Sequence, residues 1–451
     1  MTKFARPTVW RRRRGPATLV QDMNASLTAA RGRRGVPSAA FALVALLTLS
    51  ACAEDKPLNT FEPRGPQAQM IDNLMTRIWV IMAIVFVLVV GGGIALAIKG
   101  RVKAEDFDYE DLPYQRHGND KLEIGWTIAP AVLLAIICIP TVATIWKLEE
   151  RNEPQELDVM VIGRQWWWEY RYDVDGDGFF QDANGDGVVD DKDIEWPLEL
   201  ALDNDDLSIA NELVIPTGEQ IDLVITSGDV IHSFWIPRLN GKRDAVPGRI
   251  HTWSLEADEP GKYNGWCTEY CGLSHARMRM STIALSPADF ETWYANQMLQ
   301  AELPEAPAEG EVASPEWAGR QTFEQVCASC HVVDTPGFEY AENFVAPLTA
   351  KAAPNLTHFA TRSVMAGAIF SQYSEDPTGR LIDADDDSFD VSNYLGLADE
   401  GRFNDAQLRR WISDAPSQKA MAAEDQRGMP AFPQLTDEDL TNLVAYLATL
   451  D

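Results

Sequence analysis

The chain has 451 residues, which is enough for two or three domains. Its 68 Asp and Glu residues outnumber its 38 Lys and Arg residues, and the formal net charge of −30 argues against nucleic-acid binding. Six cysteines are too few for a disulfide scaffold in a chain of this length, and the patterns below predict another use for each of them.

Residues 1–51 have the features of a secretory signal peptide. A basic cluster at Arg11–Arg14 precedes the short apolar stretch Ala39–Leu49, and small residues follow. The ending Leu-Ser-Ala-Cys52 is similar to a bacterial lipoprotein cleavage site, which predicts Cys52 as a lipidated N-terminus. The alternative is ordinary signal cleavage beside an incidental cysteine. We expect residues 52–70 to form a short extracytoplasmic segment.

Residues 71–150 predict a transmembrane hairpin. Ile78–Ile98 and Trp126–Trp146 contain no charged residue, and each has 21 residues, which matches the roughly 20 that a helix needs to cross a bilayer. The loop between them is rich in basic residues, which favours a cytoplasmic loop with both ends of the hairpin outside. These basic residues are Lys99, Arg101, Lys103, Arg116 and Lys121. Cys138 lies inside the second span and is interpreted as a packing residue.

Residues 151–297 predict a β-sandwich or barrel. Apolar residues alternate in several runs, and Pro and Gly punctuate the sequence between the runs, which is typical of half-buried strands. Two such runs are Leu157, Val159, Val161 and Ile221, Leu223, Ile225.

A loop near the end of this domain concentrates soft metal ligands. Two thiols, an imidazole and a thioether fall within twelve residues, and such a set selects copper over magnesium or calcium. Two thiolates can bridge two copper ions, with one imidazole for each ion, whereas a single blue copper would need only one cysteine. The predicted ligands are Cys267, Cys271, His275, Met278, the Glu269 carbonyl and His232, which lies 35 residues before Cys267. The alternative is a disulfide between the two cysteines.

Residues 173–210 form an acidic insertion in this domain. A twelve-residue run in it has Asp or Asn at loop positions 1, 3, 5, 9 and 12 and Gly at position 6, which approximates an EF-hand calcium loop. The predicted calcium ligands are Asp182, Asn184, Asp186, Asp190 and Asp193. The alternative is a solvated acidic loop.

A haem attachment signature follows a linker. Residues 298–315 are rich in Pro, Ala and Glu, and we expect them to be flexible enough for the next domain to move. In residues 316–451, Cys327-Ala-Ser-Cys330-His331 is the pattern for covalent haem, in which two thioethers hold the porphyrin and the histidine binds iron. A helix over 317–326 is expected to lead into it.

A downstream Met or His should supply the sixth iron ligand. The candidates are His358, Met365, Met421 and Met429. Met429 is followed by a predicted helix in which Thr436 and Asp439 resemble a capping box, with apolar residues on one face. These apolar residues are Leu440, Leu443, Val444 and Leu447.

Several segments together resemble subunit II of the haem–copper cytochrome c oxidases. Besides the hairpin and the copper loop, they are Gly163–Tyr170, His232–Trp235 and Asp244–Arg249, so the resemblance covers most of residues 70–297. It implies a cupredoxin fold and a binuclear, mixed-valence CuA centre. The implied CuA ligands are His232, Cys267, Glu269 through its carbonyl, Cys271, His275 and Met278.

The resemblance also implies roles for three side chains. The Glu269 carboxylate would bind magnesium or manganese shared with subunit I. Trp166 would be the residue where electrons enter, and three adjacent Trp residues are not expected all to point inward in a strand. Glu150 would lie at the entrance of a proton path, although a solvated acid at a helix end is the alternative.

Residues 316–451 are similar to class I cytochromes c. This similarity implies an all-α fold with Met429 as the sixth ligand, and Pro354–Leu356 and Trp411–Ile412 match the cytochrome domain attached to some bacterial oxidases. Residues 371–400 are longer and more acidic than the similarity leads us to expect, and the sequence assigns them no function.

The sequence therefore predicts a multidomain electron-input subunit of a proton-pumping terminal oxidase. Electrons would pass from haem c to CuA and then to subunit I, where oxygen is reduced. Expected partners are subunit I, subunit III and an upstream quinol–cytochrome c reductase or cytochrome c donor. The location would be a bacterial cell membrane, with both globular domains outside. The alternatives are the input subunit of a CuA-type nitric oxide reductase and a membrane-tethered redox carrier.

Overall fold

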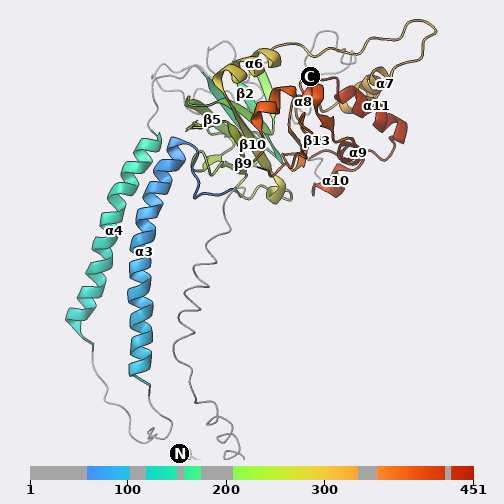
Figure 1. Ribbon diagram of the computed structural model, residues 1–451. Coiled ribbons are helices and arrows are strands. Elements are labelled where there is room, and N and C mark those ends of the chain that lie inside the picture. Colours follow the sequence, from blue (N-terminus) through green and yellow to red (C-terminus); the bar gives the residue numbers. More distant parts are fainter. Residues whose placement is uncertain are drawn as a thin grey trace, which may run out of the picture. The chain divides into compact units, whose positions relative to one another are not determined.

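The computed structural model describes residues 58–101, 118–149, 157–173, 207–333, 353–386, 388–421 and 428–451 (Figure 1). The predicted signal peptide, Cys52, Glu150 and the five predicted calcium ligands lie outside these residues.

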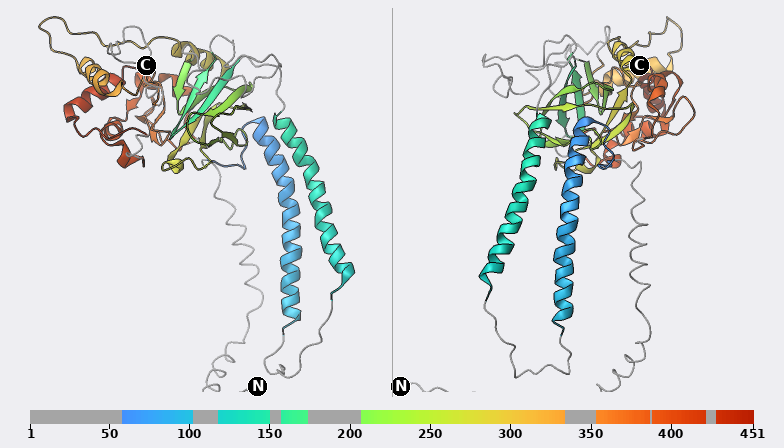
Figure 2. Two further views of the ribbon diagram at one scale, coloured as in Figure 1. Left: turned by 180° about the vertical axis from the view of Figure 1, so that it is seen from behind. Right: turned by 60° about the vertical axis from the view of Figure 1, so that its left-hand side comes forward.

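Two long apolar helices lie side by side in both sets of views (Figures 1 and 2). They are α3 (Pro66–Lys99) and α4 (Asp120–Glu149), and each is long and apolar enough to cross a membrane. Pro66 occupies the first turn of α3, where the missing N–H leaves no hydrogen bond unmade. Both helices extend beyond the predicted apolar spans, because their polar ends continue the same helical hydrogen bonding.

The start of α3 and the residues just before it are bound to the β domain by backbone hydrogen bonds. The N–H of Arg64 donates to the carbonyl of Arg238 at 2.7 Å, and the N–H of Ala68 donates to the carbonyl of Leu239 at 3.1 Å. The N-terminal end of the first membrane helix is therefore anchored to the domain that carries the copper loop.

The β domain contains two main sheets. The first has the strand order β3-β2-β1-β5-β8, and the second has the order β4-β10-β9. The first comprises β1 (Asp158–Arg164), β2 (Trp167–Tyr172), β3 (Leu207–Ala210), β5 (Ile221–Ser227) and β8 (His251–Leu255). The second comprises β4 (Glu212–Pro216), β9 (Gly261–Trp266) and β10 (Arg279–Leu285). A small hairpin pairs β6 (His232–Phe234) with β7 (Arg243–Ala245), and helix α6 (Pro287–Gln297) ends the domain.

The alternating apolar runs form strands as predicted. Val159 and Val161 lie on β1, which pairs in parallel with the β5 residues Leu223 and Ile225 in direct register. All four side chains are fully buried in one core. The prediction of a β-sandwich is therefore confirmed.

The C-terminal region is mainly helical and has its own core. Its helices and helical turns are α7 (Pro315–Thr322), η3 (Phe323–Cys327), η5 (Val391–Gly396), α8 (Leu397–Glu400), α9 (Asp405–Ser413), α10 (Ala415–Gln418) and α11 (Asp437–Leu447). Thr436 and Asp439 form the predicted capping box of α11. Helices α7 and α11 cross so closely at Gly319 that a Cβ atom there would lie 1.9 Å from the Asn442 carbonyl oxygen.

Short strands are an addition to the all-helical expectation for this region. They are β11 (Val364–Met365), β12 (Phe370–Ser371), β13 (Tyr373–Glu375) and β14 (Arg402–Phe403). β13 pairs with β14 across the acidic stretch 371–400, and six buried apolar side chains of this stretch join the core of the β domain instead of the C-terminal core.

One buried carboxylate joins β1 and β2 through two ion pairs. Glu169 is 2.6 Å from the Nε of Arg164 and 2.8 Å from the Nε of Arg171. Burial alone would raise the pKa of Glu169, but the two guanidinium groups outweigh it and lower the pKa from 4.5 to about 2. This charge therefore stabilises the fold above about pH 4.5, and the stabilisation is lost as the pH falls toward 2.

We expect Glu169→Gln to lower the free energy of unfolding at pH 7 by about 3 kcal/mol, the equivalent of the lowered pKa. The difference from the unaltered protein should shrink as the pH approaches 2, because Glu169 is then protonated. Urea unfolding of the detergent-solubilised chain at pH 7 and pH 3, followed by tryptophan fluorescence, measures both effects. The matched control is Glu259→Gln, which breaks an exposed pair with Arg64 and should cost less than about 1 kcal/mol. An equal loss in both variants would contradict the prediction.

Candidate metal centre

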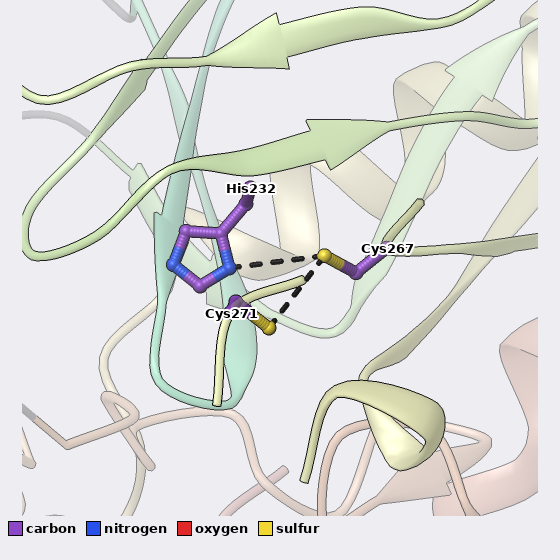
Figure 3. A group of neighbouring side chains, drawn as sticks. All are labelled: His232, Cys267 and Cys271. Carbon is purple, nitrogen blue, oxygen red and sulfur yellow. Dashed lines mark hydrogen bonds between the residues drawn. The ribbon is translucent and has the colours of Figure 1, made fainter. Parts of the chain in front are cut away.

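Three predicted copper ligands converge in a buried pocket of the β domain (Figure 3). The sulfur atoms of Cys267 and Cys271 are 3.7 Å apart, and the Nδ1 of His232 is 3.8 Å from the sulfur of Cys267. Both cysteines are free, and their separation is far beyond the roughly 2.05 Å of a disulfide bond. The geometry therefore favours a metal centre over the disulfide alternative.

The other predicted ligands lie around the same sulfur pair. The Nδ1 of His275 and the sulfur of Met278 are each 3.7 Å from the sulfur of Cys271. The carbonyl oxygen of Glu269 is 3.2 Å from the sulfur of Cys267. The sulfur of Cys267 thus has an imidazole and a carbonyl beside it. The sulfur of Cys271 has an imidazole and a thioether beside it. This soft donor set fits two copper ions.

Two glycines allow the ligands to approach each other. A Cβ atom on Gly163 would lie 2.7 Å from the imidazole of His232, so only glycine leaves room for the ring beside β1. Gly272 has φ +114°, a conformation that other residues rarely adopt, and a Cβ there would lie 2.9 Å from the side-chain nitrogen of Gln165. The loop after Cys271 therefore depends on glycine to turn back toward His275.

A carboxylate that the sequence reasoning missed orients His232. The Nε2–H of His232 donates to Oδ1 of Asp229 at 2.8 Å, which leaves Nδ1 as the ligand atom facing the cysteines. Asp229 is itself fixed, because Oδ2 accepts the backbone N–H of Gln165 at 2.6 Å. The signal was present in the sequence as an acid three residues before a ligating histidine.

The two thiols share one proton before metal binds. The contact with Cys271 lowers the pKa of Cys267 to about 4, despite burial and with help from His232. The same contact, together with burial, raises the pKa of Cys271. One thiolate therefore exists at neutral pH, and metal binding must displace the proton that remains on the other sulfur.

Trp166 and its neighbour Gln165 are bonded directly to the backbone of this pocket. The indole N–H of Trp166 donates to the carbonyl of Cys271 at 3.0 Å, and the side-chain amide of Gln165 donates to the same oxygen at 2.6 Å. The turn between β1 and β2 is therefore bonded directly to the backbone of a predicted ligand.

Trp166, Trp167 and Trp168 do not all point inward from one strand, in line with the expectation, although all three are buried. Their exposed fractions are 4%, 7% and 0%. Trp166 lies in the turn rather than in the strand, and Trp168 packs on Phe234 with ring centroids 5.4 Å apart. Trp167 points to the other side, where Arg164 lies over its ring and residues of the C-terminal region cover it.

A second site lies in a cavity of about 510 Å³ lined mainly by the C-terminal region. The predicted haem residues Cys327, Cys330, His331 and Met429 all line it. Its volume lies within the range of pockets that enclose small ligands, and its other lining residues are mostly apolar. The residues present therefore fit a covalently held haem.

His331 is prepared to bind iron through one nitrogen. Its Nδ1–H donates to the carbonyl of Pro354 at 2.8 Å, which leaves Nε2 free as the ligand atom. Burial lowers the pKa of His331, so the ring is neutral at physiological pH. Among the candidate sixth ligands, Met365 and Met421 line the cavity together with Met429. His358 does not line it, and its Nδ1 bonds the backbone of Asp451 instead.

The cavity lined by the predicted haem residues and the pocket of the predicted copper ligands meet at Trp166. Trp166 and Trp167 line the cavity, and so does Lys419, which the sequence reasoning missed. The ammonium group of Lys419 donates to the carbonyl of Trp166 at 2.6 Å and to that of Ala366 at 3.1 Å. No local sequence signal identifies Lys419, because its partners lie 253 and 53 residues away.

Comparison with known families covers both the helices and the β domain. Residues 157–285 match the family model described as cytochrome C oxidase subunit II, periplasmic domain, and residues 58–144 match the corresponding transmembrane domain. All six predicted copper ligands lie within the first match.

Individual relatives extend the comparison. Cytochrome c oxidase subunit 2 of Alkalihalophilus pseudofirmus is 30% identical over 411 residues, covering 90% of this chain and 94% of the relative. The probable cytochrome c oxidase subunit 2 of Rickettsia prowazekii is 33% identical over 260 residues, covering 55% and 76%. The solved periplasmic domain of subunit II of cytochrome oxidase from Bradyrhizobium japonicum is 28% identical, covering 33% of this chain and 96% of that chain, with a TM-score of 0.24.

We expect Asp229→Asn to weaken copper retention about 10- to 100-fold, because the imidazole of His232 loses its orienting carboxylate. Competition between the full-length protein and a copper chelator measures the change. The matched control is Glu219→Gln, an exposed acid before β5 that should leave retention unchanged. Retention that is unchanged in Asp229→Asn would contradict the orienting role.

Proposed function

Because the chain belongs to the family of cytochrome c oxidase subunit II, we propose that it passes electrons from its own covalent haem to a binuclear CuA centre. From there they would continue to subunit I of the oxidase, where oxygen is reduced with proton pumping. The chain would thus be both the electron acceptor and the electron relay of the enzyme.

The observation that carries this proposal is the position of Trp166. Trp166 lines the cavity that holds the haem attachment residues, and its indole N–H donates to the carbonyl of the ligand Cys271. A single residue therefore touches both sites, and no solvent layer separates its indole from the ligand. Lys419 fixes the backbone of the same residue.

In this proposal the chain holds copper through the six predicted ligands. They are His232, Cys267, the Glu269 carbonyl, Cys271, His275 and Met278. The bound copper pair and the haem would supply one-electron redox chemistry. The protein keeps both thiols and His232 buried, which excludes water from the ligand atoms and protects the thiols from oxidation.

The haem would be held by Cys327 and Cys330 through thioethers and by His331 at iron. Met429 is proposed as the sixth ligand, and methionine ligation raises the potential of a haem that must donate to copper. The neutral, hydrogen-bonded ring of His331 supports its part in this assignment.

Membership of the family implies a membrane complex with subunit I. We propose that subunit III and an upstream donor, either a quinol–cytochrome c reductase or a cytochrome c, complete the partners, and that the complex lies in a bacterial cell membrane. The Glu269 side chain is exposed, which leaves it free to bind magnesium or manganese at a subunit surface. Lipidation of Cys52, calcium binding at Asp182–Asp193 and the proton-path role of Glu150 stay predictions.

We expect the purified chain to contain two copper atoms. Elemental analysis measures the ratio, and electron paramagnetic resonance shows whether one unpaired electron is shared by two copper nuclei. Cys271→Ser should lose copper, because it removes a bridging thiolate. Cys138→Ser is the matched control, since Cys138 lies in α4 away from the site. A ratio of one, or a mononuclear spectrum, would refute the binuclear centre.

We expect Met429→Ala to lower the haem midpoint potential by on the order of 0.1 V, because methionine ligation raises it. Turnover with the upstream donor should fall with it. Redox titration of the haem band and oxygen uptake by the whole oxidase measure the two effects. Met365→Leu and Met421→Leu are matched controls, because both residues line the same cavity. A shift in either control but not in Met429→Ala would assign the ligand elsewhere.

A further inference from the structure

We propose that residues 372–386 and 388–397, here called the clasp, fix the C-terminal region on the β domain. The C-terminal region, here also called the haem-binding region, would then reserve Trp166 for the chain's own haem. The proposal rests on the proposed function, because it assumes transfer from the C-terminal region to copper. The clasp lies within the acidic stretch to which the sequence assigned no function.

The clasp is anchored by a fully buried carboxylate of the β domain. Glu212, at the start of β4, has an exposed fraction of 0%. It accepts the hydroxyl hydrogen of Tyr394 in the clasp, and it accepts both the hydroxyl and the backbone N–H of Ser363, the latter at 3.0 Å. A buried carboxylate is unfavourable without such donors. Glu212 therefore needs the C-terminal region to supply these donors, and separation of the two regions would remove them.

The clasp also contributes side chains to the core of the β domain. Six of its aromatic and aliphatic side chains are buried in the same cluster as the strands β1, β4, β5 and β10. They are Tyr373, Ile382, Phe389, Val391, Tyr394 and Leu397. Separation of the two regions would expose these side chains to water, which opposes movement of the haem-binding region.

Opposite charges meet at the edge of this contact. Arg279 on β10 forms an ion pair with Asp385, and its backbone N–H donates to the carbonyl of Gly367 at 3.1 Å. The ammonium group of Lys262 on β9 donates to the carbonyl of Asp383 at 3.3 Å and lies over the ring of Phe389. Two basic side chains of the β domain thus contact the acidic segment of the clasp, one through an ion pair and one through a backbone carbonyl.

A second contact holds the copper loop itself. The hydroxyl of Ser274 donates to the carbonyl of Ala420, and the guanidinium of Arg277 donates to the carbonyl of Gln418. Lys419 lies between Gln418 and Ala420 in the sequence, and its ammonium group donates to the carbonyl of Trp166. The turn that carries Trp166 and the copper loop are therefore both hydrogen-bonded to the C-terminal region.

This contact closes the surface through which a separate donor would reach Trp166. A donor protein needs contact with the ring of Trp166 or its immediate surroundings, and both Trp166 and Trp167 are buried. External electrons must then enter through the haem-binding region. The clasp determines donor specificity at the copper site, and it does so without any motion of the tethered region.

Hydrogen–deuterium exchange of the full-length, detergent-solubilised protein tests the clasp without any cofactor. Amides of Tyr373–Glu375 and Val391–Gly396 should exchange at least about 100-fold more slowly than a free chain. The variant Tyr394→Phe with Asp385→Asn should speed their exchange at least about tenfold. Arg409→Gln is the matched control, because its ion pair with Asp437 lies within the C-terminal region. Free-chain rates in the unaltered protein would overturn the proposal.

Lengthening the linker tests the consequence for electron transfer. About forty Gly and Ser residues inserted after Glu309 should leave the haem-to-copper rate after flash reduction unchanged if the clasp holds. In the double variant the same insertion should slow transfer about fivefold, because the effective concentration of a free tethered domain falls with linker length. An equal slowing with the clasp intact would overturn the proposal.

The two measurements separate the clasp from the relay. If the double variant speeds exchange of the protected clasp amides but no variant transfers electrons from haem to copper, the proposed function fails and the clasp as a docking device stands. If transfer is fast but the clasp amides are unprotected, the relay stands and the clasp is wrong.

Discussion

The carbonyl of Cys271 is the point on which both candidate sites depend. It accepts hydrogen bonds from Trp166 and Gln165, so the copper loop cannot move away from the β1–β2 turn without breaking both. In the same turn, the backbone N–H of Gln165 donates to Asp229, and Asp229 orients the imidazole of His232. Because Trp166 also lines the haem cavity, one small turn determines where the copper ligands and the haem pocket lie relative to each other.

Buried polar groups specify this arrangement more strictly than apolar packing alone could. Glu169 lies between Arg164 and Arg171, and Glu212 accepts donors from Ser363 and Tyr394. A buried carboxylate that shifts by one residue loses its donors and carries the full penalty of desolvation, whereas an apolar side chain can often repack. Each carboxylate therefore selects one register between the segments that it joins.

The sequence predicted those parts of the site whose signal is local. The copper ligands could be named because their chemistry and close spacing limit the possible metals, and the capping box of Thr436 and Asp439 lies within one helical turn. Lys419 and Glu212 were missed because their partners lie between 53 and 253 residues away. The burial of Trp167 had no local signal for the same reason, since it lines a cavity formed mainly by residues of another region.

The linker and the clasp act on different steps of the same association. The first part of the linker is not free, because Ala301 is buried in the C-terminal core and the carbonyl of Pro304 accepts a hydrogen bond from Arg320. A short tether raises the effective concentration of the haem-binding region near the β domain, but it cannot by itself hold the two in contact. The buried carboxylate Glu212, the shared core and the ion pair between Arg279 and Asp385 keep the two regions in contact. The linker thus makes docking an intramolecular event, and the contacts of the clasp stabilise the docked state.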